Sequence, residues 1–179
     1  MSAQPYNIEI LQDHREKTPF QFGQFEGRVS VVHMKTGDYT IRGFESVFAI
    51  ERKALPDLVG CVAQSRARFQ RELSRLARFR YAAVVIEANY EDVMNGNWYS
   101  KVSPQSVIGS IASWQIRYHV PFLFAGSMGA HMTLSLMRKF LAANGMPTAS
   151  EKRAPQLSGD VQMPAQPTLL PEDSPFVLQ

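Results

Sequence analysis

The run Ala49–Asp57 constrains the fold most, because an apolar strand pattern ends there in three charged residues, Glu51-Arg52-Lys53. A strand sends successive side chains to opposite faces, so Glu51 and Lys53 point to one face and Arg52 points to the other. We therefore expect the face that carries Arg52 to pack against the interior and the face that carries Glu51 to hold the reactive groups.

Two segments, Gly37–Ile41 and Val47–Glu51, flank a short glycine-containing loop and predict a β-hairpin. If the residues next to the loop pair with one another, Asp38 lies opposite Glu51. Two carboxylates in these positions repel and destabilise the strand pair. A divalent cation between them removes the conflict, and Mg²⁺ binds one or two carboxylates together with phosphate oxygens. Lys53, beside Glu51, is then placed to hold a scissile phosphate or to orient the attacking water.

Each fragment alone has an ordinary interpretation, since Gly-Asp is a common turn and Glu-Arg-Lys is a common solvated run at a strand end. The combination is more specific: an Asp38 strand, an acid-x-lysine strand, and Asp57 four residues after Lys53. This pattern resembles the PD-(D/E)XK nucleases. The run Glu-Arg-Lys-x-x-x-Asp is similar to that of the XPF-type structure-specific DNA endonucleases.

The resemblance extends over about residues 6–143, and the motif positions carry no substitution. The opening Asp-x-Arg-Glu motif stands at Asp13–Glu16, and the Gly-Asp-Tyr motif stands at Gly37–Tyr39. The Glu-Arg-Lys-x-x-x-Asp motif stands at Glu51–Asp57, and the arginine of the following helix is Arg66.

This resemblance implies an α/β fold of the restriction-endonuclease-like type, with a mixed central β-sheet flanked by α-helices. It also implies a DNA endonuclease with Mg²⁺ or Mn²⁺ as its cofactor. The site residues that it implies are catalytic Glu16, Asp38, Glu51, Arg52, Lys53 and Asp57, metal-binding Asp13, Asp38 and Glu51, and DNA-binding Arg15 and Arg66. Asp57 also suits the first turn of a helix, where acidic residues are favoured, so two roles are open for it.

Two alternatives to an active XPF-type enzyme are open. One is a catalytically silent DNA-binding or scaffold subunit, although the silent partners in this family lose acids that this chain retains. The other is a junction resolvase or restriction-type nuclease, which is not expected to carry the full Glu-Arg-Lys-x-x-x-Asp run. The chain has no room for the tandem helix-hairpin-helix modules of many family members, so the means of selecting branched or flap DNA is open.

Composition places the chain among proteins of a reducing interior. Its 179 residues, 45% of them hydrophobic, predict one nuclease domain over residues 1–145 followed by a tail. The single cysteine, Cys61, excludes an internal disulfide. No membrane partner is expected, since neither a signal-peptide pattern nor a run of about 18 apolar residues is present. We expect a cytoplasmic location in a bacterium or phage-infected cell, or a nuclear location in a eukaryote.

Charge is concentrated in the nuclease part. The net charge is +3 for the whole chain and +5 for residues 1–149, which suits a polyanionic partner such as DNA. Six arginines lie on the helical stretch and just beyond it: Arg66, Arg68, Arg71, Arg75, Arg78 and Arg80. A solvated face, partly neutralised by Glu72, is the preferred interpretation for the distal ones. Arg66 is closest to the charged strand end, and its planar guanidinium suits phosphate.

The rest of the chain alternates strand and helix patterns. Further strands are expected at residues 6–10, 29–34, 81–87 and 120–125, and helices at 55–76 with a break near Gln64, from Ser103, and from Ser127 to Asn144. Residues 89–101 are expected to form a polar loop whose Trp98 and Tyr99 either stack on unpaired bases or pack against the next helix. The four histidines, His14, His33, His119 and His131, are expected to be structural or incidental.

Two features predict partners other than DNA. Helices around 104–118 and 128–143 carry apolar residues on more than one face, including Ile111 and Phe140, which predicts a homodimer, as XPF-type proteins commonly form through this region. Residues 146–179 hold six of the eleven prolines and predict a disordered tail. Its acidic and apolar end, Glu172–Leu178, is a candidate docking motif for a protein partner.

Overall fold

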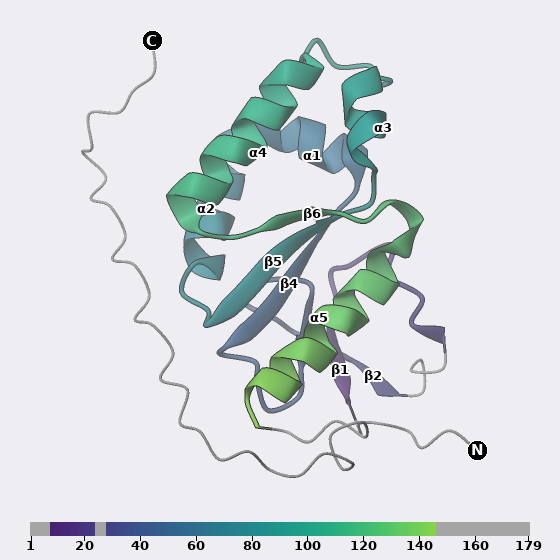
Figure 1. Cartoon of the computed structure of the whole chain (residues 1–179), viewed down its shortest axis with the longest axis vertical. Coiled ribbons are helices and arrows are strands. Elements are labelled where there is room, and N and C mark those ends of the chain that lie inside the picture. Colours follow the sequence, from purple (N-terminus) through teal and green to yellow (C-terminus); the bar gives the residue numbers. More distant parts are fainter. Residues whose placement is uncertain (1–7, 24–27, 146–179) are drawn as a thin grey trace.

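A six-stranded mixed sheet forms the centre of the structure, with the strand order β2-β1-β3-β4-β5-β6 (Figure 1). The computed structural model describes residues 8–23 and 28–145. The strands are β1 (Ile10–Asp13), β2 (Val29–Val32), β3 (Tyr39–Ile41), β4 (Phe48–Lys53), β5 (Tyr81–Ile86) and β6 (Phe122–Phe124). β3 is antiparallel to both of its neighbours, and the other neighbouring strands are parallel. The predicted α/β class with a mixed central sheet is therefore confirmed.

Helices cover both faces of this sheet. They are α1 (Leu55–Val62), α2 (Arg66–Leu76), α3 (Tyr90–Asn95), α4 (Pro104–Tyr118) and α5 (Gly129–Ala143), the last preceded by the 3₁₀ turn η2 (Gly126–Met128). The helices α1, α2 and α4 lie together on one side, and α5 crosses the other side (Figure 1). Within the described parts of the chain, every helix is too short or too polar to span a bilayer.

The central strand β5 supplies side chains to two separate cores, which explains its continuous apolar sequence. Val84 and Ile86 pack with α1, α2 and α4, whereas Ala83 and Val85 pack on the side of α5. In β4 the same alternation places Ala49 in the first core, and Phe48 and Ile50 in the second. Continuing it along β4 places Glu51 and Lys53 on the α1 side and Arg52 on the α5 side. Because β4 and β5 are parallel, both strands end at the same edge of the sheet, which is called the carboxyl edge below.

Several boundaries differ from the sequence-based expectation. β1 runs from Ile10 to Asp13, whereas a strand was expected at 6–10, of which residues 6–7 lie outside the described part of the chain. β2 ends at Val32, and β6 is only three residues long. The helix α5 begins at Gly129, because Ser127 lies within η2. The expected break between α1 and α2 and the start of α4 after Ser103 are confirmed, and the Ser103 hydroxyl accepts a hydrogen bond from the Ser106 amide. The expected tail lies outside the described residues.

The helix α3 lies within the segment expected to be a loop. Its start is stabilised by the Asn89 amide, which donates to a carboxylate oxygen of Asp92 at 2.7 Å. The pattern Asn-x-x-Asp is a helix-start signal, related to the capping box, that was available in the sequence. Of the two aromatic residues that follow, Trp98 packs against the core and donates its Nε1–H to the Val102 carbonyl at 2.9 Å. Tyr99 is fully exposed.

Ile111 and Phe140 were expected to lie on a dimer surface, but both are buried in the hydrophobic core of the single chain. Ile111 is 4% exposed and Phe140 is 8% exposed in the single chain. The Phe140 ring lies 4.8 Å from that of Phe48 and 5.5 Å from that of Phe44. The expectation for these two residues is therefore wrong, because sheet and helix layers already bury them. Ile116, also on α4, is 74% exposed.

We predict that Phe140→Ala lowers the free energy of unfolding by about 3–5 kcal/mol, as expected for an aromatic residue removed from a packed core. Ile116→Ala on the exposed side of α4 should change it by no more than about 0.5 kcal/mol. Urea unfolding of both variants measures the difference. Equal stabilities would contradict the burial of Phe140 described above.

Candidate active site

The pairing of β3 with β4 brings Asp38 to Glu51. Tyr39 pairs with Ile50, so the next residues along the two strands, Asp38 and Glu51, lie opposite one another. The regular pattern of strand hydrogen bonds ends at this point. The Asp38 amide donates to the carbonyl of Ile50, at 2.8 Å, although Ile50 is the partner of Tyr39 in the strand pairing. The Asp38 carboxylate Oδ2 then accepts the Arg52 backbone N–H at 2.7 Å, in place of a main-chain carbonyl. The predicted register of the hairpin is confirmed.

Gly37 makes this close approach sterically allowed. Its φ is +76°, and a Cβ atom at this position would lie 3.2 Å from both the Ala49 Cβ and the Ile50 carbonyl oxygen. A side chain would therefore strain the backbone and push β3 away from β4 just before Asp38. The glycine of the Gly-Asp-Tyr motif is a requirement of the strand pairing.

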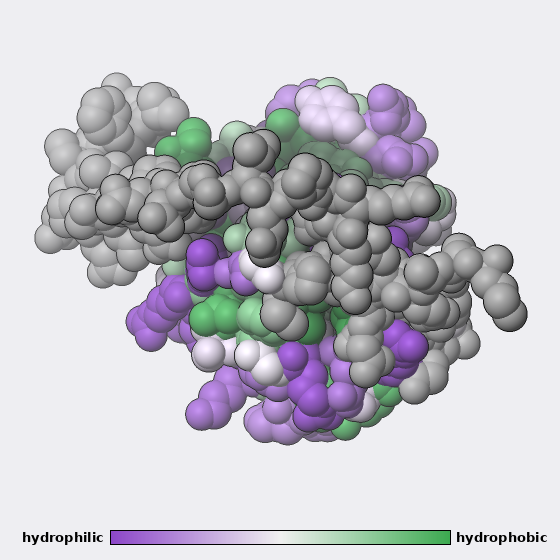
Figure 2. All heavy atoms as spheres, turned by 60° about the horizontal axis from the view of Figure 1, so that its bottom comes forward, coloured by the Kyte–Doolittle hydropathy of each residue, from purple (hydrophilic) through white to green (hydrophobic). Residues whose placement is uncertain are grey.

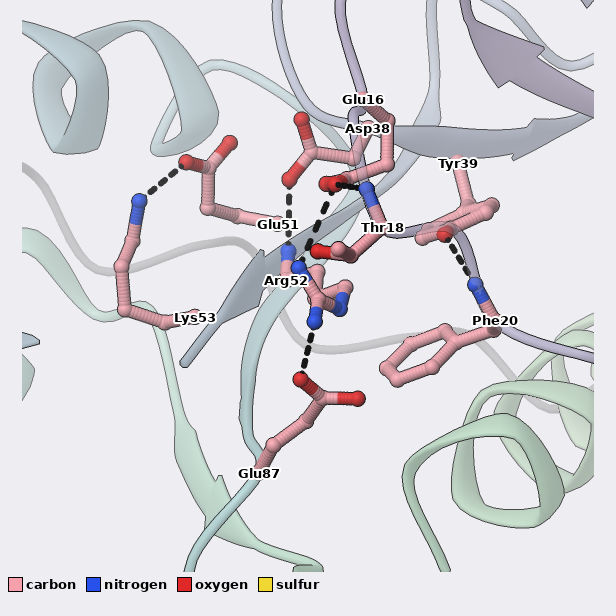
Figure 3. Close-up of polar contacts among 9 residues, drawn as sticks. All are labelled: Glu16, Thr18, Phe20, Asp38, Tyr39, Glu51, Arg52, Lys53 and Glu87. Carbon is pink, nitrogen blue, oxygen red and sulfur yellow. Dashed lines mark hydrogen bonds and ion pairs between the residues drawn. The ribbon is translucent and has the colours of Figure 1, made fainter. Parts of the chain in front are cut away.

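Glu51 and Lys53 form an ion pair on the α1 side of the sheet (Figure 3). The Lys53 ammonium lies 2.7 Å from Glu51 Oε1, and the two side chains are only 14% and 10% exposed. The ammonium also lies 4.9 Å from the centre of the Phe69 ring, on α2. The Phe69 ring of α2 thus covers part of a charged pair at the end of β4.

The electrostatics of the two acids show mutual conflict. Burial, and after it the Glu51 carboxylate, together raise the pKa of Asp38 to about 8. Burial likewise raises the pKa of Glu51, although Lys53 opposes that rise. Burial alone would lower the pKa of Lys53, but the Glu51 carboxylate keeps it above its ordinary value. A buried and a partly buried carboxylate that both favour protonation in the metal-free protein are a donor set that fits a hard divalent cation such as Mg²⁺ or Mn²⁺.

Asp13 lies at the end of β1 and orients Arg15. Its Oδ1 accepts the Arg15 amide at 2.7 Å and the Arg15 Nε–H at 2.8 Å, and its Oδ2 accepts from Arg15 at 3.0 Å and from the Met34 amide at 2.7 Å. Burial opposes the charge of Asp13, yet these donors lower its pKa to about 2. With four donors on two oxygens, Asp13 serves here to orient Arg15, and its metal-binding role stays a prediction. The Arg15 side chain itself is 59% exposed.

Arg52 and Glu16 lie on the opposite side of β4 from the Glu51–Lys53 pair. The Arg52 guanidinium contacts Glu16 Oε1 at 3.2 Å and forms a second ion pair with Glu87 (Figure 3). It also lies 5.6 Å from the centre of the Phe20 ring. Glu87 directly follows β5 and was missed by sequence reasoning, because no local pattern connects it with residues 35 positions earlier. The only available signal was an acidic residue at the end of an apolar strand.

Arg66 and Asp57 lie on the two helices that follow β4. Arg66 begins α2, where its guanidinium donates to the Ser110 hydroxyl at 2.9 Å and lies 5.1 Å from the Trp114 ring. It thus joins α2 to α4, and its contact with DNA stays a prediction. Asp57 is exposed in the first turn of α1, where a carboxylate stabilises a helix N-terminus. Its catalytic role also stays a prediction.

The structure does assemble one histidine set that the sequence did not suggest. Asp13, His14 and His33 place one ligand atom each within 4.8 Å of one another, and the two imidazole rings are 5.3 Å apart. The Asp13 oxygens are engaged by Arg15 and Met34, however, which leaves two exposed imidazoles. Protein zinc sites use three or four protein ligands, so two imidazoles are too few to form a zinc site.

The fold and the site together define an α/β protein of the restriction-endonuclease-like class, in which a β-hairpin presents two acids and a lysine at the carboxyl edge. The ERCC4 domain matches residues 12–135, well over half of the chain. The chain therefore belongs to the ERCC4 domain family, and the resemblance seen in the motifs is confirmed.

Solved structures show the same fold. XPF from Aeropyrum pernix superposes with a TM-score of 0.58 at 19% identity, over 76% of this chain and 68% of that chain. XPF from Aeropyrum pernix in complex with DNA gives a TM-score of 0.56 at 16% identity, over 75% of this chain and 65% of that chain. The chain thus spans about two thirds of the length of these structures. A comparison with curated proteins gave no significant match.

We predict that the metal-free protein loses stability as the pH rises from about 4 to about 8. Folded Asp38 keeps its proton up to a pKa of about 8 instead of 3.8, so the folded state binds more protons than the unfolded state over this range. The stabilisation is complete below the unfolded pKa and is lost towards the folded one, at up to about 1.4 kcal/mol per pH unit for one proton.

Asp38→Asn should flatten this dependence and stabilise the protein at about pH 8 in the presence of chelator. Asparagine retains an oxygen that accepts the Arg52 amide but carries no charge to repel Glu51. Urea unfolding at several pH values measures the effect, with Asp57→Asn as a control acid on the surface. An Asp38→Asn profile that is parallel to wild type would contradict the burial of a strained acid pair.

Proposed function

We propose that this chain is a divalent-metal-dependent endonuclease that hydrolyses phosphodiester bonds in DNA, with branched or flap DNA as its substrate. The observation that carries the proposal is the pair formed by partly buried Asp38 and buried Glu51, placed by the β3–β4 register beside Lys53. Membership of the ERCC4 domain family supports it, as does the similarity to an XPF protein solved in complex with DNA.

The roles of the residues follow from their charges. Asp38 and Glu51 would hold Mg²⁺ or Mn²⁺, which when bound supplies charge stabilisation for phosphoryl oxygens and a more acidic water. Lys53 has a raised pKa, so it is a cation at neutral pH and acts on phosphate or water as a hydrogen-bond donor. A general base requires an uncharged amine, and the ion pair with Glu51 favours the charged form, so the role proposed for Lys53 is that of a hydrogen-bond donor.

Phosphate binding is assigned to the exposed part of Arg15 and to Arg66. Asp13 holds the Arg15 guanidinium in a fixed orientation, which lowers the entropy lost when a phosphate binds. Both arginines would contact the backbone and so position DNA without reading its sequence. The fully exposed Tyr99 is a candidate for stacking on an unpaired base, whereas Trp98 is engaged in the core.

We also propose a homodimer as the working form. The support is family membership and the exposure of large apolar side chains on the described surface, among them Ile116, Tyr90, Met94 and Met128. On the face shown in Figure 2, hydrophobic residues reach the surface in small areas between hydrophilic ones. A monodisperse monomer at micromolar concentration in analytical ultracentrifugation would overturn this part. A protein partner for the tail and a cytoplasmic or nuclear location stay predictions.

We predict that the wild-type protein cleaves flap or fork DNA only in the presence of Mg²⁺ or Mn²⁺, and that Glu51→Gln abolishes cleavage without unfolding the chain. A positioned catalytic group contributes roughly 10²–10⁴-fold, so the loss should be at least of this order. A panel of flap, fork, duplex and single-stranded DNA measures it, with Glu91→Gln on the exposed start of α3 as a matched control. DNA binding without cleavage by the wild type would favour the silent-subunit alternative.

A second prediction concerns the grip on DNA. Arg66→Ala should weaken binding to all DNA structures alike and reduce the slope of log affinity against log salt by about 0.9, the value for one lost phosphate contact on duplex DNA. Arg75→Ala is the matched control, because Arg75 is paired with Glu72 on the same helix. Binding is measured in Ca²⁺ at several salt concentrations. An unchanged slope for Arg66→Ala would contradict a phosphate contact by Arg66 and leave it the structural role of joining α2 to Ser110 and Trp114 of α4.

A further inference from the structure

We propose that Glu87 is a positioning residue of the active site, which acts on Asp38 through Arg52. The inference rests on the proposed function, and it adds a residue from outside the three sequence motifs. Glu87 directly follows β5, the strand next to β4 at the carboxyl edge.

Arg52 is held at both ends of its guanidinium. Its side chain is 9% exposed and its two terminal nitrogens each meet a carboxylate, from Glu16 after β1 and from Glu87 after β5. Its Nε is buried and has no hydrogen-bond partner among the described residues. The guanidinium is therefore fixed by its two ends, and the loss of either carboxylate leaves it attached at one end only. Breaking one pair of a buried charge network is strongly unfavourable because the remaining charge is uncompensated.

The backbone of Arg52 connects this network with Asp38. The backbone N–H of Arg52 donates to Asp38 Oδ2 at 2.7 Å, so the residue that Glu87 anchors by its side chain orients the Asp38 carboxylate by its main chain. The Glu87 amide also donates to the Lys53 carbonyl at 3.0 Å. Glu87 thus restrains the end of β4 at two consecutive residues, Arg52 through its carboxylate (Figure 3) and Lys53 through its backbone amide.

The contact of Glu87 with Arg52 is separate from the ion pair of Glu51 with Lys53. Glu51 and Lys53 lie on the α1 side of the sheet, whereas Arg52 contacts Phe20, a residue of the core on the α5 side. Glu87 reaches Arg52 and is partly exposed, at 29%, so it holds the site from the side opposite to the ion pair of Lys53. Removing its charge should therefore alter the position of Asp38 without removing any group of the predicted metal and phosphate site.

The test compares Glu87→Gln, Glu87→Asp, Arg52→Lys and the Arg52→Lys/Glu87→Gln double variant, with Glu91→Gln as a control acid. Two quantities are measured on each protein: the rise in Tm as a function of Mn²⁺ concentration, which does not depend on cleavage, and kcat and KM for a flap DNA. The Tm in chelator reports the purely structural effect.

We expect Glu87→Gln to raise the half-saturating Mn²⁺ concentration and lower kcat by about 10–100-fold, the range for groups that orient metal ligands, with KM for DNA unchanged. Glu87→Asp, which keeps the charge, should recover part of the loss. The double variant should be no worse than Arg52→Lys alone, since the two residues act through one contact.

Three outcomes overturn the inference. The first is that Glu87→Gln has the same Mn²⁺ dependence of Tm and the same kcat as the wild type. The second is that its loss of kcat is matched by a fall of Tm in chelator, which indicates a purely structural effect. The third is that the losses of kcat in the two single variants multiply in the double variant. Failure of the proposed function looks different: the wild-type protein then cleaves no DNA in the panel. In that case a Mn²⁺ response that is weakened by Glu87→Gln still supports the positioning role, and the lack of any Mn²⁺ response in the wild type overturns both.

Discussion

The repulsion between Asp38 and Glu51 is the constraint on which the structure of the carboxyl edge depends. Strand pairing brings the two acids together, and burial denies them the water that would screen their charges. The surrounding contacts each reduce the conflict: Lys53 neutralises Glu51, and the Arg52 amide donates to Asp38. The metal-free protein thus keeps an unfavourable pair of acids at the point where a cation would be bound, as is common in sites formed for function instead of for stability.

One strand carries this arrangement to both faces of the sheet. On the α1 side β4 presents Glu51 and Lys53, and on the α5 side it presents Arg52. A helix would spread three consecutive residues over its circumference, whereas the two-residue period of a strand separates them cleanly. The acids can therefore be served by two independent sets of neighbours, one from α2 and one from the ends of β1 and β5.

The sequence predicted those features that depend on local order. The Asp38–Glu51 register, the break between α1 and α2, and the start of α4 at Ser103 follow from turn and cap residues close by. Features that depend on contacts between distant segments could not be predicted from the sequence. Glu87 joins Arg52 across 35 positions, and Phe140 is buried by rings from the β3–β4 region, which no periodicity of α5 could reveal. Asp13 followed its motif, but its occupation by Arg15 and Met34 depends on how the chain turns after β1.

The two outer strands of the sheet have a consequence for how copies of this chain can meet. β2 is four residues long and β6 is three, and each leaves one side of its backbone without a neighbouring strand in the described sheet. Edges this short offer few main-chain hydrogen bonds to an incoming strand, which protects against uncontrolled growth of the sheet from chain to chain. Any specific association must then be encoded in side chains, where substitutions can tune it without disturbing the backbone of the site.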